Sequence, residues 1–282
     1  MYNNSFSRSN PGLIILLIDQ SGSMEDPMPA NGLKLAENAA DAVNSVINEI
    51  ILKLTITTDD GDEEVKKSVY LPVIGYGGKG SGTGNQYDYE AEILLDKWIN
   101  EIEEPEFSKV KSLLNSETDL FEVVKPTYGG GTPMASAFAS ARDLVAAWIQ
   151  THNTADDPTP VIINITDGMP TDSVSELKSI AKEIMAMEIP DGNPLIFNIH
   201  LSAKPNPVSI EYPNDLSQCT DEESKLLFEL SSAASVDLIN EIPTLSAKGL
   251  TGGEKLFLSN VGNPAKLIEF LQIGTKVKNA LK

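Results

Sequence analysis

The chain contains few cysteines and histidines, the residues that disulfide, redox and much nucleophilic chemistry need. One cysteine, Cys219, occurs among 282 residues, so no internal disulfide can form, which fits a reducing compartment. We therefore expect a cytoplasmic protein. The two histidines, His152 and His200, have no predicted nucleophile beside them, and a catalytic triad is unsupported.

Long apolar runs and basic residues are also scarce. The first apolar run, residues 13–18, ends at an acid, and it is too short for a secretory signal or for the roughly 20 apolar residues of a membrane span. We expect no membrane association. The 21 Lys and Arg are outnumbered by 41 Asp and Glu, and the net charge of −20 argues against nucleic acid as a partner. Basic proteins and cations are the better candidates.

Short apolar runs alternate with helical patterns along the chain, which is typical of strands joined by crossover helices. Runs without polar residues indicate central strands that are covered on both faces. We therefore predict an α/β fold: a doubly wound, mostly parallel central sheet with helices on both faces and one antiparallel edge strand. The predicted strands of this sheet are residues 13–18, 120–124, 161–165, 195–201 and 255–259.

Helical spacing of apolar residues predicts the crossover helices. Polar residues ahead of them are typical of caps, and we expect Asn31, Thr132 and Thr220 to lie at helix N-termini. The predicted helices are residues 36–51, 134–149, 177–185, 226–233 and 264–273.

An acidic hairpin is expected near residues 53–75. Two strand-like runs, residues 53–58 and 67–75, flank an acidic tip whose Asp-Gly step predicts a turn. We therefore expect the two runs to pair antiparallel at a sheet edge.

Residues 75–84 are rich in glycine and contain Gly75, Gly77 and Gly80 at the spacing of a dinucleotide-binding fingerprint. No helix follows directly to hold a phosphate, so a flexible loop is favoured. Residues 89–102 fit a helix, although part of this segment also fits a strand. No linker separates two cores, and we expect an N-terminal tail, residues 1–12, followed by a single domain, residues 13–282.

Three polar turns stand where predicted strands end or a predicted helix begins. Asp19, Ser21 and Ser23 follow the first strand, Thr132 precedes a helix, and Asp167 follows the strand at 161–165. Because loops at the carboxyl ends of parallel strands lie together, we expect these five residues to meet. Carboxylates and hydroxyls without Cys or His suit a hard cation such as Mg²⁺ or Mn²⁺. Each turn alone is also explained by capping, because Ser, Thr and Asp are common cap residues.

The three turns together resemble the metal-ion-dependent adhesion site (MIDAS) of von Willebrand factor type A (VWA) domains, which have a Rossmann-like fold. The resemblance rests on Asp19-x-Ser21-x-Ser23, on Gly130-Gly131-Thr132-Pro133 and on Thr166-Asp167-Gly168, in the family's order. It implies that Ser21, Ser23 and Thr132 contact a Mg²⁺ (or Mn²⁺ or Ca²⁺) ion, and that Asp19 and Asp167 contact it directly or through water. It also implies an open coordination position that takes an Asp or Glu from a partner protein.

Longer stretches, among them residues 161–168 and 195–202, are similar to stand-alone bacterial intracellular VWA proteins of the tellurite-resistance-associated group. This resemblance implies a role in signalling or stress response, with a Ser/Thr kinase or a type 2C phosphatase, encoded by a neighbouring gene, as the partner. We therefore expect a non-enzymatic, metal-dependent protein-interaction module.

Two alternatives use the same residues. One is a metal-dependent phosphoryl hydrolase, although Ser21 stands where a second aspartate is expected and no lysine lies near Asp167 in the sequence. The other is a purely structural metal ion that joins the three turns.

Overall fold

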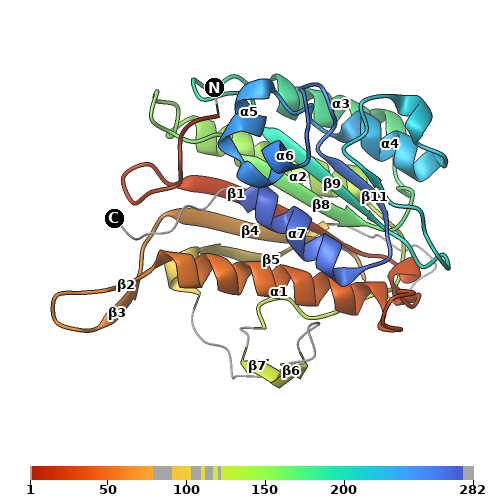
Figure 1. Cartoon of the computed structure of the whole chain (residues 1–282), viewed down its shortest axis with the longest axis horizontal. Helices are drawn as coiled ribbons and strands as arrows, with labels where there is room; N and C mark the ends of the chain where they lie inside the picture. Colours follow the sequence, from red (N-terminus) through yellow and green to blue (C-terminus); the bar gives the residue numbers. More distant parts are fainter. Residues whose placement is uncertain (1, 79–90, 103–108, 112–116, 120–121, 276–282) are drawn as a thin grey trace.

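The structure, a computed structural model, describes residues 2–78, 91–102, 109–111, 117–119 and 122–275. Its centre is a seven-stranded sheet with the order β10-β11-β9-β8-β1-β4-β5 (Figure 1). The strands of this sheet are β1 (Gly12–Gln20), β4 (Val69–Gly77), β5 (Ala91–Trp98), β8 (Val161–Thr166), β9 (Leu195–Leu201), β10 (Ile210–Glu211) and β11 (Phe257–Val261).

The sheet is mostly parallel. Strand β1 lies inside the sheet and pairs in parallel with β4 and β8, and β8, β9 and β11 continue the parallel order. At one edge β5 pairs antiparallel with β4, and at the other the two-residue β10 pairs antiparallel with β11. The predicted fold class, a mostly parallel α/β sheet with an antiparallel edge, is thereby confirmed.

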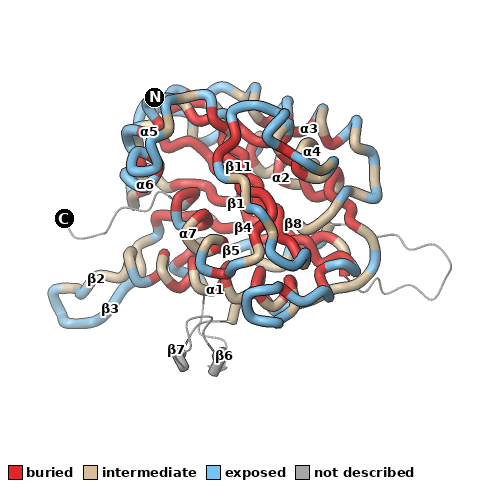
Figure 2. The backbone as a smooth tube through the Cα atoms, turned by 45° about the vertical axis from the view of Figure 1, so that its right-hand side comes forward, coloured by how far each residue is buried: buried red, intermediate tan, exposed pale blue. Residues whose placement is uncertain are grey.

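Helices cover both faces of the sheet. The α-helices are α1 (Leu35–Leu54), α2 (Met134–Ile149), α3 (Val174–Ala186), α4 (Glu222–Leu230), α5 (Val236–Glu241), α6 (Pro243–Ala247) and α7 (Pro264–Thr275). Leu16 of β1 belongs to the core with α1 and α7, whereas its neighbours Ile15 and Leu17 belong to the core with α2, α3 and α4. The central strands are therefore buried on both sides (Figure 2), as consecutive apolar residues require. No described helix is long and apolar enough to cross a membrane.

The predicted pairing of residues 53–58 with 67–75 is wrong. A hairpin does form at the acidic tip, but it joins β2 (Thr55–Thr57) to β3 (Glu63–Val65) in a separate two-stranded sheet, which projects from the molecule (Figure 1). The second run is β4, which lies parallel to β1 inside the central sheet. Its residues are apolar enough to be buried on both faces, and this burial decides its partner.

Residues 91–98 form β5, so the strand interpretation of this segment holds and the helix interpretation is wrong. The strand predicted at 120–124 is also wrong where it can be checked, because residues 122–124 lie in no strand and 120–121 lie outside the described residues. The Asn44 side chain of α1 holds this segment instead. Its Oδ1 accepts from the amides of Val123 and Val124 at 3.0 and 2.9 Å, and its Nδ2 donates to the carbonyl of Val124 at 2.8 Å.

The expected caps are each displaced along the chain. Helix α4 is capped by Asp221, which accepts from the Ser224 amide, rather than by Thr220. The residue before α2 is Pro133, not Thr132, and the residue before α1 is Lys34, three positions after Asn31. Of the glycine-rich segment, residues 75–77 belong to β4, and residues 79–84 lie outside the described residues.

Candidate metal centre

Three loops carry the five predicted ligands. The first loop, residues 19–25, starts with the last two residues of β1; the second, residues 129–133, precedes α2; the third, residues 166–172, starts with the last residue of β8. Strands β1 and β8 are parallel neighbours, with Ile18 opposite Ile165. Their carboxyl ends therefore deliver the first and third loops to the same edge of the sheet.

Side chains join the first loop to the third. The Ser23 hydroxyl donates to Asp167 Oδ1 at 2.8 Å, and the Ser21 and Ser23 hydroxyls lie 3.2 Å apart. The Thr166 hydroxyl donates to Asp19 Oδ2 at 2.5 Å. Asp19 Oδ1 also accepts from the Ser21 amide at 2.8 Å. Hydrogen bonds therefore connect four of the five predicted residues, Asp19, Ser21, Ser23 and Asp167. Their role as metal ligands stays a prediction.

The second loop is joined to both of the others through its main chain. The Gly22 amide donates to the Gly130 carbonyl at 3.1 Å. The Thr132 amide donates to the Thr171 hydroxyl at 2.9 Å, and the Thr171 amide donates to the Thr132 carbonyl, also at 2.9 Å. Thr132, the fifth predicted residue, is therefore held at the same junction.

The two carboxylates share a poorly solvated place. Asp19 is fully buried, and burial raises its pKa above the ordinary value, although hydrogen bonds from Ser21 and Thr166 act in the opposite direction. The pKa of Asp167 is raised to about 7, mainly by burial and also by the nearby charge of Asp19, whereas the Ser23 hydroxyl acts in the opposite direction. Both acids are thus harder to ionise than free carboxyl groups. A bound cation would stabilise their ionised forms.

The donors fit a hard divalent cation. All five predicted side chains offer oxygen, which Mg²⁺, Mn²⁺ and Ca²⁺ prefer. Within the described part of the chain, no three His, Cys, Asp or Glu side chains converge on a possible metal site. A site at the three loops would accordingly depend on serine and threonine hydroxyls beside its two carboxylates.

The end of β4 braces this junction and was not foreseen from the sequence. Gly77 has φ +102, and a Cβ there would lie 2.7 Å from the Ser21 nitrogen and 2.8 Å from the Gly131 oxygen. The Gly78 amide donates to the carbonyls of Gln20 and Gly129, each at 2.7 Å. Of the three glycines at the spacing of a dinucleotide fingerprint, Gly80 lies outside the described residues, and Gly77 serves close backbone approach instead.

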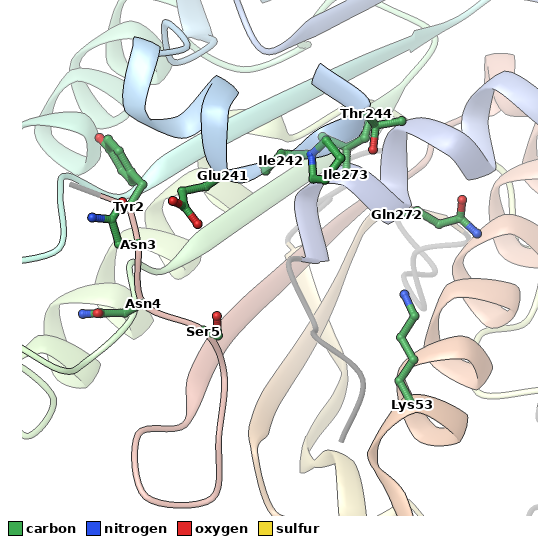
Figure 3. Close-up of a pocket in the computed structure, with 11 residues that line it drawn as sticks. Tyr2, Asn3, Asn4, Ser5, Lys53, Glu241, Ile242, Thr244, Gln272 and Ile273 are labelled. Carbon is green, nitrogen blue, oxygen red and sulfur yellow. The ribbon is translucent and has the colours of Figure 1, made fainter. Parts of the chain in front are cut away.

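A cleft of about 340 Å³ borders the junction. Ser23 and Asp167 form one side of it, and Asp26, Lys204 and Glu223 bring charged groups to its lining. A second cavity, of about 360 Å³, lies away from the three loops (Figure 3). Its lining comes from the N-terminal tail ahead of β1, the end of α1, the α5–α6 region and the end of α7, and none of the three loops contributes to it.

Comparisons with known proteins concern the fold. No protein-family model and no curated protein matches the sequence. Among solved structures, the chain is similar to the pilus adhesin SpaC from Lactobacillus rhamnosus GG, with 14% sequence identity and a TM-score of 0.50. This match covers 97% of the chain and 31% of the adhesin, so the chain spans about a third of the adhesin's length.

Two further structures have lower TM-scores. Manganese-loaded TRAP from Plasmodium vivax is 18% identical over 70% of this chain and 59% of its own, with a TM-score of 0.37. The SpRpn10 VWA domain is 12% identical over 68% of this chain and 75% of its own, also with a TM-score of 0.37. A VWA domain is thus among the structural neighbours, and the likeness to the adhesin extends over nearly the whole α/β fold.

Proposed function

We propose that the chain is a VWA-type protein-interaction module that binds an acidic side chain of a partner through a divalent cation at the three loops. The observation that carries this proposal is the junction itself, where hydrogen bonds connect each loop to the other two. By the resemblance to the VWA adhesion site, Ser21, Ser23 and Thr132 would hold Mg²⁺, with Asp19 and Asp167 acting directly or through water. The bound ion would supply the positive charge that attracts a carboxylate.

The cleft beside the junction is where the partner's side chain would enter. Ser23 is exposed on its wall, so a partner can reach the ion from solvent. Asp26 and Glu223 would repel an acidic partner, whereas Lys204, with a side chain that is 69% exposed, would attract it. The metal charge is therefore needed to make an acidic contact favourable on a chain of net charge −20.

The alternative, phosphoryl hydrolysis, receives less support. A nucleophilic Asp19 needs a free carboxylate oxygen, but this side chain is fully buried and both of its oxygens accept hydrogen bonds, Oδ1 from the Ser21 amide and Oδ2 from Thr166. The same contacts suit a residue that orients the loops around an ion. They favour binding over hydrolysis.

The biological setting that we propose is a bacterial stress or signalling system, with a Ser/Thr kinase or a type 2C phosphatase as the partner. This part rests on the similarity of residues 161–168 and 195–202 to the tellurite-resistance-associated group. The pull-down described below tests it, whereas thermal unfolding tests the metal site alone.

Thermal unfolding in EDTA, Mg²⁺, Mn²⁺ and Ca²⁺ tests the metal site. A ligand at about 100 times its dissociation constant stabilises the folded state by about 2.7 kcal/mol, so a rise in Tm is expected for the wild type and none for Asp19→Ala. No response to any of these ions in the wild type would overturn the proposal.

A pull-down tests the interaction. A Ser/Thr kinase or a type 2C phosphatase encoded beside this chain should be retained in Mg²⁺, released by EDTA and lost with Asp19→Ala plus Thr132→Ala. Retention that is insensitive to both EDTA and the double substitution would mean that binding does not use the three loops. A far-UV spectrum of the variant shows whether its fold persists.

A further inference from the structure

Helix α2 begins without a cap of its own. The residue before it, Pro133, has a side chain that cannot accept a hydrogen bond from the first turn. Thr132 is of a type that commonly caps helices, but within the described part of the chain its hydroxyl takes part in no hydrogen bond. The first amides of a helix have no partner inside the helix, so they must be paired from elsewhere.

The third loop supplies such a partner. Asp172 Oδ2 accepts from the amide of Ser136, in the first turn of α2, at 3.1 Å, although 36 residues separate the two in the chain. Beside it, Thr171 is joined to Thr132 in both directions. The Thr171 hydroxyl accepts from the Thr132 amide, and the Thr171 amide donates to the Thr132 carbonyl, each at 2.9 Å. We call Thr171 and Asp172 the cross-loop cap.

The carboxylate of Asp172 also brings negative charge to the start of α2. Its second oxygen, Oδ1, is buried and has no hydrogen-bond partner among the described residues. A buried carboxylate oxygen is costly unless positive charge lies nearby, and the N-terminus of a helix carries about half a positive elementary charge. That positive end follows Thr132 directly, where it would oppose a bound cation, and the carboxylate of Asp172 offsets it.

We propose that Thr171 and Asp172 are positioning residues for Thr132: they fix the second loop to the third and cap α2, so that the Thr132 hydroxyl stays free to bind a cation. This inference rests on the proposed function, because it assigns Thr132 to a metal site. Thr132 is only 5% exposed; burying a hydroxyl costs free energy unless it is paired, and a bound cation would pair it. Without the Asp172 carboxylate, the Ser136 amide loses its partner and the second loop is held less firmly to the third.

Two substitutions of Asp172 separate its hydrogen bond from its charge. Asp172→Ala removes both, whereas Asp172→Asn removes the charge but keeps an oxygen that can accept from the Ser136 amide. Ser173→Ala is the matched control, because Ser173 is the next residue in the chain but caps a different helix, α3, by accepting from the Glu176 amide at 3.2 Å. Two measurements are made on each protein: Mn²⁺ affinity by titration calorimetry, and hydrogen exchange of the Thr132 and Ser136 amides by NMR without metal.

We expect Asp172→Ala to weaken Mn²⁺ binding by at least about tenfold, because loss of a residue that orients a metal ligand typically weakens metal binding by about 10- to 100-fold. The same variant should speed exchange of the Ser136 amide and, through Thr171, of the Thr132 amide. Asp172→Asn should keep both amides protected and lose less affinity for Mn²⁺. Ser173→Ala is expected to leave all these readings at the wild-type level.

The inference is overturned if Asp172→Ala keeps wild-type protection of the Thr132 amide, or if Ser173→Ala changes that amide as much. Equal losses of Mn²⁺ affinity in Asp172→Ala and Asp172→Asn would also overturn it, because only the charge of Asp172 would then matter. A wild type that binds no Mn²⁺ would remove the proposed function, and the exchange of the Thr132 amide would still decide whether the cross-loop cap positions the second loop.

Discussion

The Ser23 hydroxyl donates a hydrogen bond to Asp167 Oδ1 at 2.8 Å, although 144 residues separate the two in the chain. This contact joins the loop after β1 to the loop after β8 at the place where the sequence predicts a metal. Ser23 is exposed, so the bond contributes little to folding, about 1 kcal/mol or less. The contact matters because it places a hydroxyl and a carboxylate, two oxygen groups that could bind the same metal ion, next to each other.

Ser23→Ala should therefore separate metal binding from folding. Without metal, we expect its Tm to stay within a few degrees of the wild type, because an exposed hydrogen bond is lost. With Mg²⁺, the rise in Tm should be smaller than that of the wild type. The control is Ser179→Ala, which removes another exposed hydroxyl bonded to an acid, Glu183, on α3. Equal responses of both variants to Mg²⁺ would contradict a ligand role for Ser23.

Metal binding should strengthen as pH rises toward about 7. The pKa of Asp167 is about 7 in the folded protein, above its value in an unfolded chain of about 4, so folding favours the protonated acid. Without metal, this residue's contribution to stability is greatest below about pH 4 and declines between about pH 4 and 7. A cation competes with that proton, so metal stabilisation should grow over the same window. Tm values with EDTA and with Mg²⁺, from about pH 5 to about pH 8, measure both trends.

The variant Asp167→Asn is the control for this pH dependence. It keeps an oxygen near Ser23 but cannot ionise, so the metal-free profile should flatten through the same window and the response to Mg²⁺ should fall at every pH. A profile that keeps the wild-type shape would assign the titration to another group.

Asn44→Ala should destabilise the fold by about 2 to 4 kcal/mol, because it leaves three main-chain groups without their partner, the two buried groups of Val124 and the partly buried amide of Val123. Urea unfolding measures the loss. The neighbouring Ser45→Ala, which removes only a hydroxyl bond to a carbonyl within α1, should change stability by about 0.5 kcal/mol or less. If both variants unfold at the same urea concentration, Asn44 does not hold this segment.

Gly77→Ala should cost several kcal/mol and disturb metal binding, because the new Cβ would collide with the main chain of the first and second loops. Gly61→Ala is the matched control. Gly61 also has a positive φ, +89, but nothing lies within 4 Å of a Cβ there, so only about 1 kcal/mol of backbone strain is expected. Unfolding in urea compares the two, and similar losses would show that close approach at Gly77 is unimportant.

The fold class was predictable because its signals are local. Runs of consecutive apolar residues identified β1, β8 and β9, and the spacing of apolar residues identified α2 and its boundaries. Consecutive apolar residues reflect a strand that is buried on two faces, and apolar residues at helical spacing reflect a helix that is buried on one face. Each pattern can be recognised within a single short segment.

Pairing and conformation were less predictable where neighbouring segments compete. The Asp-Gly step correctly marked a turn, but the strand that follows that turn is only three residues long, and the longer run behind it joined β1 instead. Residues 91–98 became an edge strand because β4 offered a free side for pairing. Such choices depend on segments that are distant in the chain, and tertiary context then overrides local propensity.

The sequence by itself determined the α/β class, the central strands and the five oxygen-bearing residues proposed to bind a metal, because those features are written in residue type and spacing. Only the tertiary structure decided which strand lies beside β1 and how Gly77 lets the loops approach. These relationships depend on contacts between segments that are distant in the chain, and no local pattern specifies which segments will meet.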